Sequence, residues 1–148
     1  MSEDHTPYPG DLAGPAELLK LAEEYRQAAL VVAGLGRRGA PLSLAPYRLN
    51  AIHAVELYLN ALLLHAGLPS SRIRGLQHDL ATRTELAVEN GLMLRQRTAA
   101  HLKAMGRSRE YLVTRYGPEL TSTLSQVNRL AATLDEVAAK VAKAVGHA

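Results

Sequence analysis

The sequence has no cysteine, no phenylalanine and no tryptophan. The lack of cysteine excludes disulfide bonds and thiolate metal sites, and it is typical of proteins kept in a reducing compartment. We therefore expect a cytoplasmic protein. Because Phe and Trp are missing, the hydrophobic 47% of the chain consists mainly of Leu, Ala and Val with a few Tyr, and we expect an aliphatic core.

Long apolar runs are also absent from the sequence. The longest fall far short of the roughly 20 residues that a membrane-spanning helix needs. The first ten residues, MSEDHTPYPG, are too acidic and polar for a signal peptide. We therefore expect no contact with a membrane.

The feature that dominates the sequence is a helical period. Apolar residues recur at spacings of three and four along most of the chain, whereas no segment has the alternation of a strand. This predicts an all-α domain over residues 15–148, with four long helices and one short helix, after a flexible lead-in at residues 1–14. The predicted helices cover residues 15–33, 47–67, 77–89 (the short one), 92–115 and 120–145.

The helix at 47–67 is predicted to be the centre of the fold, because it is apolar over most of its circumference. A line of polar residues nevertheless follows it, and unpaired buried polar groups cost about 1–3 kcal/mol each. We interpret these residues as a structural cluster in which Glu56 pairs with His78 or Arg115, and Asp79 or His78 caps the short helix. A binding site is the alternative. The predicted cluster comprises His53, Glu56, Asn60, His78 and Asp79.

The sequence gives little indication of a dinucleotide-binding site or a metal site. Gly34–Gly39 matches G-x-G-x-x-G, but a dinucleotide site needs a strand before the glycines and a helix opening within them. The prolines that follow favour a plain connection instead. No H-E-x-x-H spacing is present, so we expect neither a metal nor a cofactor.

Positive charge is concentrated in one part of the chain. Residues 70–115 hold nine basic side chains against four acidic ones, and arginine outnumbers lysine thirteen to four. Arginine suits the recognition of phosphate and carboxylate groups. An ordinary solvated surface is the alternative interpretation.

Three segments in order carry a resemblance to a known family. They are HAVELYLNALLL at residues 53–64, QHDL at residues 77–80 and YLVTRYGPE at residues 111–119. In this order they resemble the HEPN domain, over roughly residues 15–145. The resemblance implies an up-and-down helical bundle with an extra short helix that is often a homodimer. It also implies either a ribonuclease of a toxin–antitoxin or phage-defence system, with a nucleotidyltransferase-type antitoxin as partner, or a non-catalytic nucleotide- or RNA-binding module.

The catalytic members of that family resemble one another in an R-x4-6-H motif. Arg95 and His101 match it, although Gln96 stands where Asn, Asp or His is usual. In that metal-independent chemistry the His moves a proton at the ribose 2′-hydroxyl and the Arg stabilises the phosphorane. The alternative is that His101 packs inside the bundle beside Leu102 and Met105.

Three hypotheses about function follow. The first is a non-catalytic module that binds nucleotide, RNA or a partner protein through basic residues, for which we select Arg72, Arg74, Arg97 and Arg115. The second is a metal-independent endoribonuclease that uses Arg95 and His101. The third is a dimeric scaffold without a role in nucleic-acid binding.

Overall fold

The computed structural model describes residues 6–146, and within this range every regular element is a helix. The predicted all-α class is therefore confirmed. The α-helices are α1 (Pro15–Val32), α2 (Ala45–His65), α3 (Ser70–Gly75), α4 (Leu80–Glu89), α5 (Gln96–Arg107), α6 (Glu110–Tyr116) and α7 (Val127–Gly146), and the 3₁₀ helices are η1 (Ala33–Leu35), η2 (Pro41–Leu44) and η3 (Pro118–Thr123).

Helix α2 lies at the centre of the molecule, as its sequence predicted. Thirteen of its 21 residues are buried, and it contacts α1, α7, α4, α6 and α3. The core is aliphatic, with Tyr47 and Tyr58 as its buried aromatic side chains among the described residues. A helix apolar on nearly all sides needs such neighbours, because each buried aliphatic side chain contributes roughly 1.5–3 kcal/mol.

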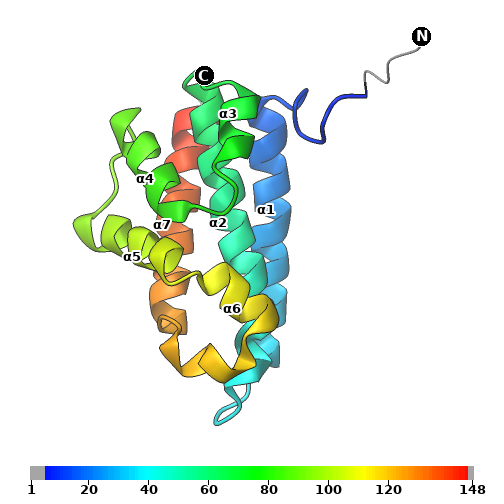
Figure 1. Cartoon of the computed structure of the whole chain (residues 1–148), viewed down its shortest axis with the longest axis vertical. Coiled ribbons are helices and arrows are strands. Elements are labelled where there is room, and N and C mark those ends of the chain that lie inside the picture. The colour runs from blue at the N-terminus through cyan, green and yellow to red at the C-terminus, as the bar shows by residue number, and fades with distance from the viewer. Residues whose placement is uncertain (1–5, 147–148) are drawn as a thin grey trace.

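Three long helices, rather than four, define the long axis. In Figure 1, α1 and α2 run antiparallel, whereas α7 lies beside α2 and runs in the same direction. Helices α4 and α5 pack on each other at one side of this group (Figure 1).

The prediction of a single helix over residues 92–115 is wrong. It is divided into α5 and α6 at Ser108 and Arg109, where Arg109 adopts a left-handed conformation with φ of 55°. Ser108 ends α5 by donating its hydroxyl to the carbonyl of Ala104 (2.9 Å). The break lets α6 pack against α2, and it buries Glu110, which bonds to Ser125.

The short helix begins at Leu80 rather than 77 and α5 at Gln96 rather than 92, and two further segments differ from the prediction. The last helix begins at Val127 rather than near 120, because Pro118–Thr123 forms η3 and Leu124 is extended. Residues 70–75, which lie between the helices predicted at 47–67 and 77–89, form α3. Both differences are local turns that the hydrophobic period does not encode.

Gly106 lies at the closest approach of α5 to α4. A Cβ atom added there would come within 2.7 Å of the backbone nitrogen of Ala81. Helix α5 continues through this glycine. The glycine is needed for space between two helices.

Short contacts are present in the segments that precede α1 and α2. The G-x-G-x-x-G segment follows α1 and holds η1 and an isolated bridge between Arg37 and Ala40, so it lacks the strand that a dinucleotide site requires. In the lead-in, of which residues 1–5 lie outside the described range, Arg74 pairs with Asp11 (2.7 Å) and lies over the ring of Tyr8.

No helix within residues 6–146 is long and apolar enough to cross a membrane.

Candidate functional site

The polar line on α2 meets partners from the segment before α4. Glu56 is buried, and both of its carboxylate oxygens lie near Nδ1 of His78, at 3.1 and 3.3 Å. The His78 ring stacks on Tyr111 with 4.5 Å between centroids. Of the two partners considered for Glu56, the structure gives His78, and this pair ties α2 to α6 and to the start of α4.

A second part of this cluster surrounds a buried arginine. Arg83 donates through Nε to Asn60 (2.7 Å) and through Nη2 to the carbonyl of Gln77 (2.9 Å). Asp79 caps α4 by accepting from the backbone of Thr82 (3.0 Å), and this bond together with the Thr82 hydroxyl lowers the pKa of Asp79. These groups therefore have partners within the fold, and their contacts are those of structural residues.

His53, the remaining member of the line, packs edge-on against Tyr25 at 4.4 Å between centroids. Burial lowers the pKa of His53, so its imidazole is neutral at pH 7. It lies on one wall of a hollow of about 380 Å³ between α1, α2 and α3.

His101 is held at the centre of a second cluster. It is 9% exposed, and its Nε2 lies 2.9 Å from Oγ of Ser125, while its Nδ1 lies 2.6 Å from Oγ1 of Thr133. The Ser125 hydroxyl has one proton, which it donates to the carboxylate of Glu110 (3.0 Å). His101 therefore donates from Nε2 and accepts at Nδ1 from the Thr133 hydroxyl.

The environment of His101 keeps it neutral. Burial, with a smaller contribution from the charge of Arg129, lowers the pKa of His101 to about 4. Arg48 extends the cluster by donating to the carbonyl of Ser125 (2.7 Å). We call Arg48, His101, Glu110, Ser125 and Thr133 the Ser125 cluster, and it joins α2, α5, α6 and α7.

Arg95 lies outside that cluster. It is the N-cap residue of α5 with an exposed side chain, and its backbone nitrogen donates to Glu136 of α7 (2.7 Å). Glu136 also accepts from Thr98 (2.6 Å) and Lys140 (2.9 Å). Burial acts to raise the pKa of Glu136, but these hydrogen bonds outweigh it and lower the pKa to about 2.

The structure thus gives Arg95 and His101 different surroundings. The Arg95 guanidinium faces solvent, whereas both ring nitrogens of His101 are used inside the bundle. Within residues 6–146 no hydrogen bond joins the two side chains. Gln96, between them in the motif, is also exposed.

A polar hollow of about 300 Å³ lies next to these residues, between the start of α5 and the start of α7. Arg97 is exposed on the first turn of α5, and Arg129 is on the first turn of α7. Arg129 donates to Thr98 (3.4 Å), which fixes its guanidinium beside the hollow. We call this feature the Arg97 hollow; the residues that line it are Arg97, Gln126, Asn128, Arg129 and Ala132.

The four arginines selected from the sequence do not share one element. Arg72 and Arg74 belong to α3, Arg97 to α5 and Arg115 to the last turn of α6, and these helices are spread along the molecule (Figure 1). Arg74 is further engaged by Asp11. Of the four, Arg97 lies with Arg129 around the Arg97 hollow, and Arg115 lies with Arg48 on the lining of a second pocket.

Sequence reasoning missed Arg129, Glu136 and Ser125. Arg129 and Glu136 are charged residues of α7, and neither belongs to a recognisable motif. Ser125 lies in the turn before α7, and only the path of the chain brings it to His101. The one signal available was the concentration of arginine near α5.

Within the described part of the chain, no group of three His, Asp or Glu side chains could hold a metal ion. Comparisons with protein-family models, with curated proteins and with solved structures gave no match to this chain. Its function is therefore inferred from its own residues.

Proposed function

We propose that this chain is a non-catalytic, HEPN-like module that binds RNA phosphates in the Arg97 hollow. The observation that carries the proposal is the composition of the hollow. Two arginines and two carboxamide side chains line it, and none of the described residues that line it is acidic. Guanidinium groups bind phosphate through paired hydrogen bonds, and amides donate further ones.

The position of Arg129 supports the proposal. It lies on the first turn of α7, a 20-residue helix, where the helix dipole disfavours positive charge by about 0.3–1 kcal/mol. Its Nε is buried without a hydrogen-bond partner among residues 6–146. A bound phosphate would remove both costs, because it offers an acceptor and a negative charge at the helix start.

The ribonuclease alternative is less well supported. A general base must reach the 2′-hydroxyl with a free ring nitrogen, whereas His101 is buried and bonded through both nitrogens. Freeing Nε2 would also remove the hydrogen bond that the Ser125 hydroxyl accepts from His101. We therefore assign His101 a structural role, and we propose no other catalytic residue on this face.

The test is binding of a fluorescent single-stranded RNA, about 12 nucleotides long, followed by anisotropy from about 50 to about 300 mM NaCl. We expect Arg97→Glu to weaken binding about tenfold or more and to reduce the salt slope by about one, because one phosphate contact is lost. Arg38→Glu is the matched control. It makes the same change of charge at an exposed residue of the connection between α1 and α2, and it should leave the slope unchanged.

Two outcomes would contradict the proposal. Equal weakening by Arg97→Glu and Arg38→Glu would mean that only net charge attracts RNA. RNA cleavage in chelator by the wild type but not by His101→Gln would favour the ribonuclease instead. The homodimer and the nucleotidyltransferase-type partner implied by the resemblance remain predictions, which sedimentation of the protein alone and with such a partner would check.

A further inference from the structure

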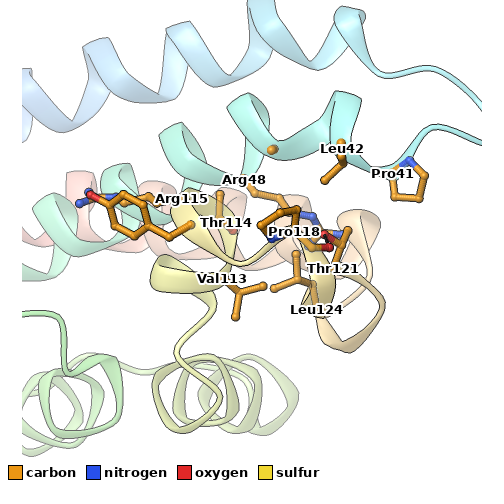
Figure 2. A pocket seen from close by; sticks show the side chains of 11 residues that line it. Pro41, Leu42, Arg48, Val113, Thr114, Arg115, Pro118, Thr121 and Leu124 are labelled. Atoms are coloured by element: carbon orange, nitrogen blue, oxygen red, sulfur yellow. Dashed lines mark hydrogen bonds between the residues drawn. The ribbon is translucent and has the colours of Figure 1, made fainter.

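A second, more enclosed pocket lies at the other side of the Ser125 cluster, between η2, the start of α2, α6 and η3. Its volume is about 210 Å³ (Figure 2). The Arg48 side chain extends from α2 toward η3, whereas Arg115 points away from it (Figure 2). We call this feature the Arg48 pocket; its lining residues used below are Leu42, Arg48, Val113, Thr114, Thr121 and Leu124.

Arg48 is unusual for a buried cation. It is 8% exposed, and within residues 6–146 its one hydrogen bond runs from Nη1 to the carbonyl of Ser125 (2.7 Å). Its Nε is buried and has no hydrogen-bond partner in the part of the chain that the structure describes. Buried arginines are normally paired with a carboxylate, because an unpaired buried charge is costly.

The carboxylate that acts on Arg48 is engaged elsewhere. Glu110 favours the charged form of Arg48 electrostatically, but its two oxygens accept from the backbone and the hydroxyl of Ser125, at 2.7 and 3.0 Å. The negative charge of Glu110 therefore offsets the positive charge of Arg48 from a distance, with Ser125 bonded to both side chains, and the two charged groups do not pair directly. Hydrogen-bonding capacity is left on the guanidinium at the pocket.

The rest of the pocket combines one more unpaired polar atom with apolar walls. Oγ1 of Thr114 is buried, and no described residue forms a hydrogen bond with it. Leu42, Val113 and Leu124 provide hydrocarbon surface. Such a site matches a ligand that has one acceptor group and a short apolar body.

We propose that the Arg48 pocket binds a small organic carboxylate, with its carboxylate on Arg48 and its hydrocarbon chain against Leu42, Val113 and Leu124. A volume of about 210 Å³ equals roughly seven waters of the liquid, so the ligand has the size of a short-chain fatty acid. A carboxylate suits the site better than a phosphate, because its single charge and two oxygens can be satisfied by one guanidinium, whereas the walls formed by Leu42, Val113 and Leu124 offer no side-chain donor to the further oxygens of a phosphate. The site is separate from the Arg97 hollow and does not depend on RNA binding.

The test uses ¹⁵N NMR of the full chain, in which the Arg48 Nε–H reports directly on the pocket. We expect sodium butyrate to shift this resonance and the Thr114 amide saturably, with a dissociation constant in the millimolar range typical of so small a ligand. Butyramide, which has the same shape without charge, should not shift them. Equal shifts from butyramide would overturn the proposal, and shifts from inorganic phosphate as large as those from butyrate would overturn its assignment to a carboxylate.

Two variants of η3 make the test independent of Arg48 itself. Thr121→Asp places a carboxylate on the lining of the pocket, so it should weaken butyrate binding about tenfold or more and raise the melting temperature of the free protein. Thr123→Asp is the control. Thr121 and Thr123 make the same bond to the carbonyl three residues earlier, but Thr123 is exposed and does not line the pocket. Equal effects of the two variants would overturn the proposal.

Discussion

His101 illustrates how hydrogen bonds at a single residue decide between chemistry and structure. Its donor and its acceptor are both used, by Ser125 and Thr133, and the charge on Glu110 fixes which nitrogen carries the proton. A protonated ring could no longer accept from Thr133. The residue that fits a catalytic motif by spacing is thus stabilised in its neutral form.

This arrangement predicts a loss of stability in mild acid. The unfolded chain binds a proton at this imidazole below its ordinary pKa of 6.5, whereas the folded protein does so only near its lowered pKa of about 4. The free energy of unfolding should therefore fall as the pH decreases from 6.5 to 4, by an amount on the order of 3 kcal/mol. Urea unfolding at intervals across this window measures it.

His101→Gln should remove much of that pH dependence, although it also lowers stability at pH 7. The exposed His65→Gln is the control and should keep the dependence of the wild type. Glu136 adds its own loss only below pH 4.5, its ordinary value, as the pH approaches 2, so the range from 4.5 to 6.5 isolates histidine. Parallel curves for the wild type and His101→Gln would show that another group is responsible.

At the scale of elements, the contact between α4 and α5 depends on the absence of a side chain. Replacing Gly106 by Ala improves intrinsic helix propensity by about 1 kcal/mol. The added Cβ would, however, meet backbone atoms of α4 at Ala81 and Leu80, at 2.7 and 3.3 Å. Backbone cannot rotate away as a side chain can, so the two helices must separate.

We therefore expect Gly106→Ala to lower the free energy of unfolding by about 1–3 kcal/mol, as overpacking does. Gly75→Ala in α3 is the matched control, because nothing lies within 4 Å of its added Cβ, and it should be neutral or slightly stabilising. Thermal or urea denaturation followed by circular dichroism measures both. A Gly106→Ala variant as stable as the wild type would contradict the close approach of α4 and α5.

At the scale of the whole molecule, the period of the hydrophobic residues predicted the long helices, but it predicted little about the segments that connect them. The central position of α2 and the extent of α1 follow from apolar residues at regular spacing. The break at Arg109 does not, because a left-handed arginine has no sequence signature and is stabilised by burial of Glu110 further along. The Arg97 hollow likewise depends on the meeting of α5 and α7.

The enclosure of α2 also predicts the order of hydrogen exchange. Helices α1, α4, α6 and α7 surround it, so its amides should exchange only when the whole domain unfolds. The short helix α3, with one buried residue, should exchange much earlier. Exchange measured by mass spectrometry checks this order, and exchange of α2 at the rate of α3 would contradict a single cooperative core.

The carboxylate that caps α5 comes from far along the chain, since Glu136 follows Arg95 by 41 residues. A ribosome releases α1 and α2 as neighbouring segments that can pair at once, but it releases the cap of α5 only after most of the protein has been made. Until then the first turn of α5 has no acceptor from α7, and the Arg97 hollow has only one of its two walls. The surface proposed to bind RNA is therefore among the last parts of the protein to form during translation.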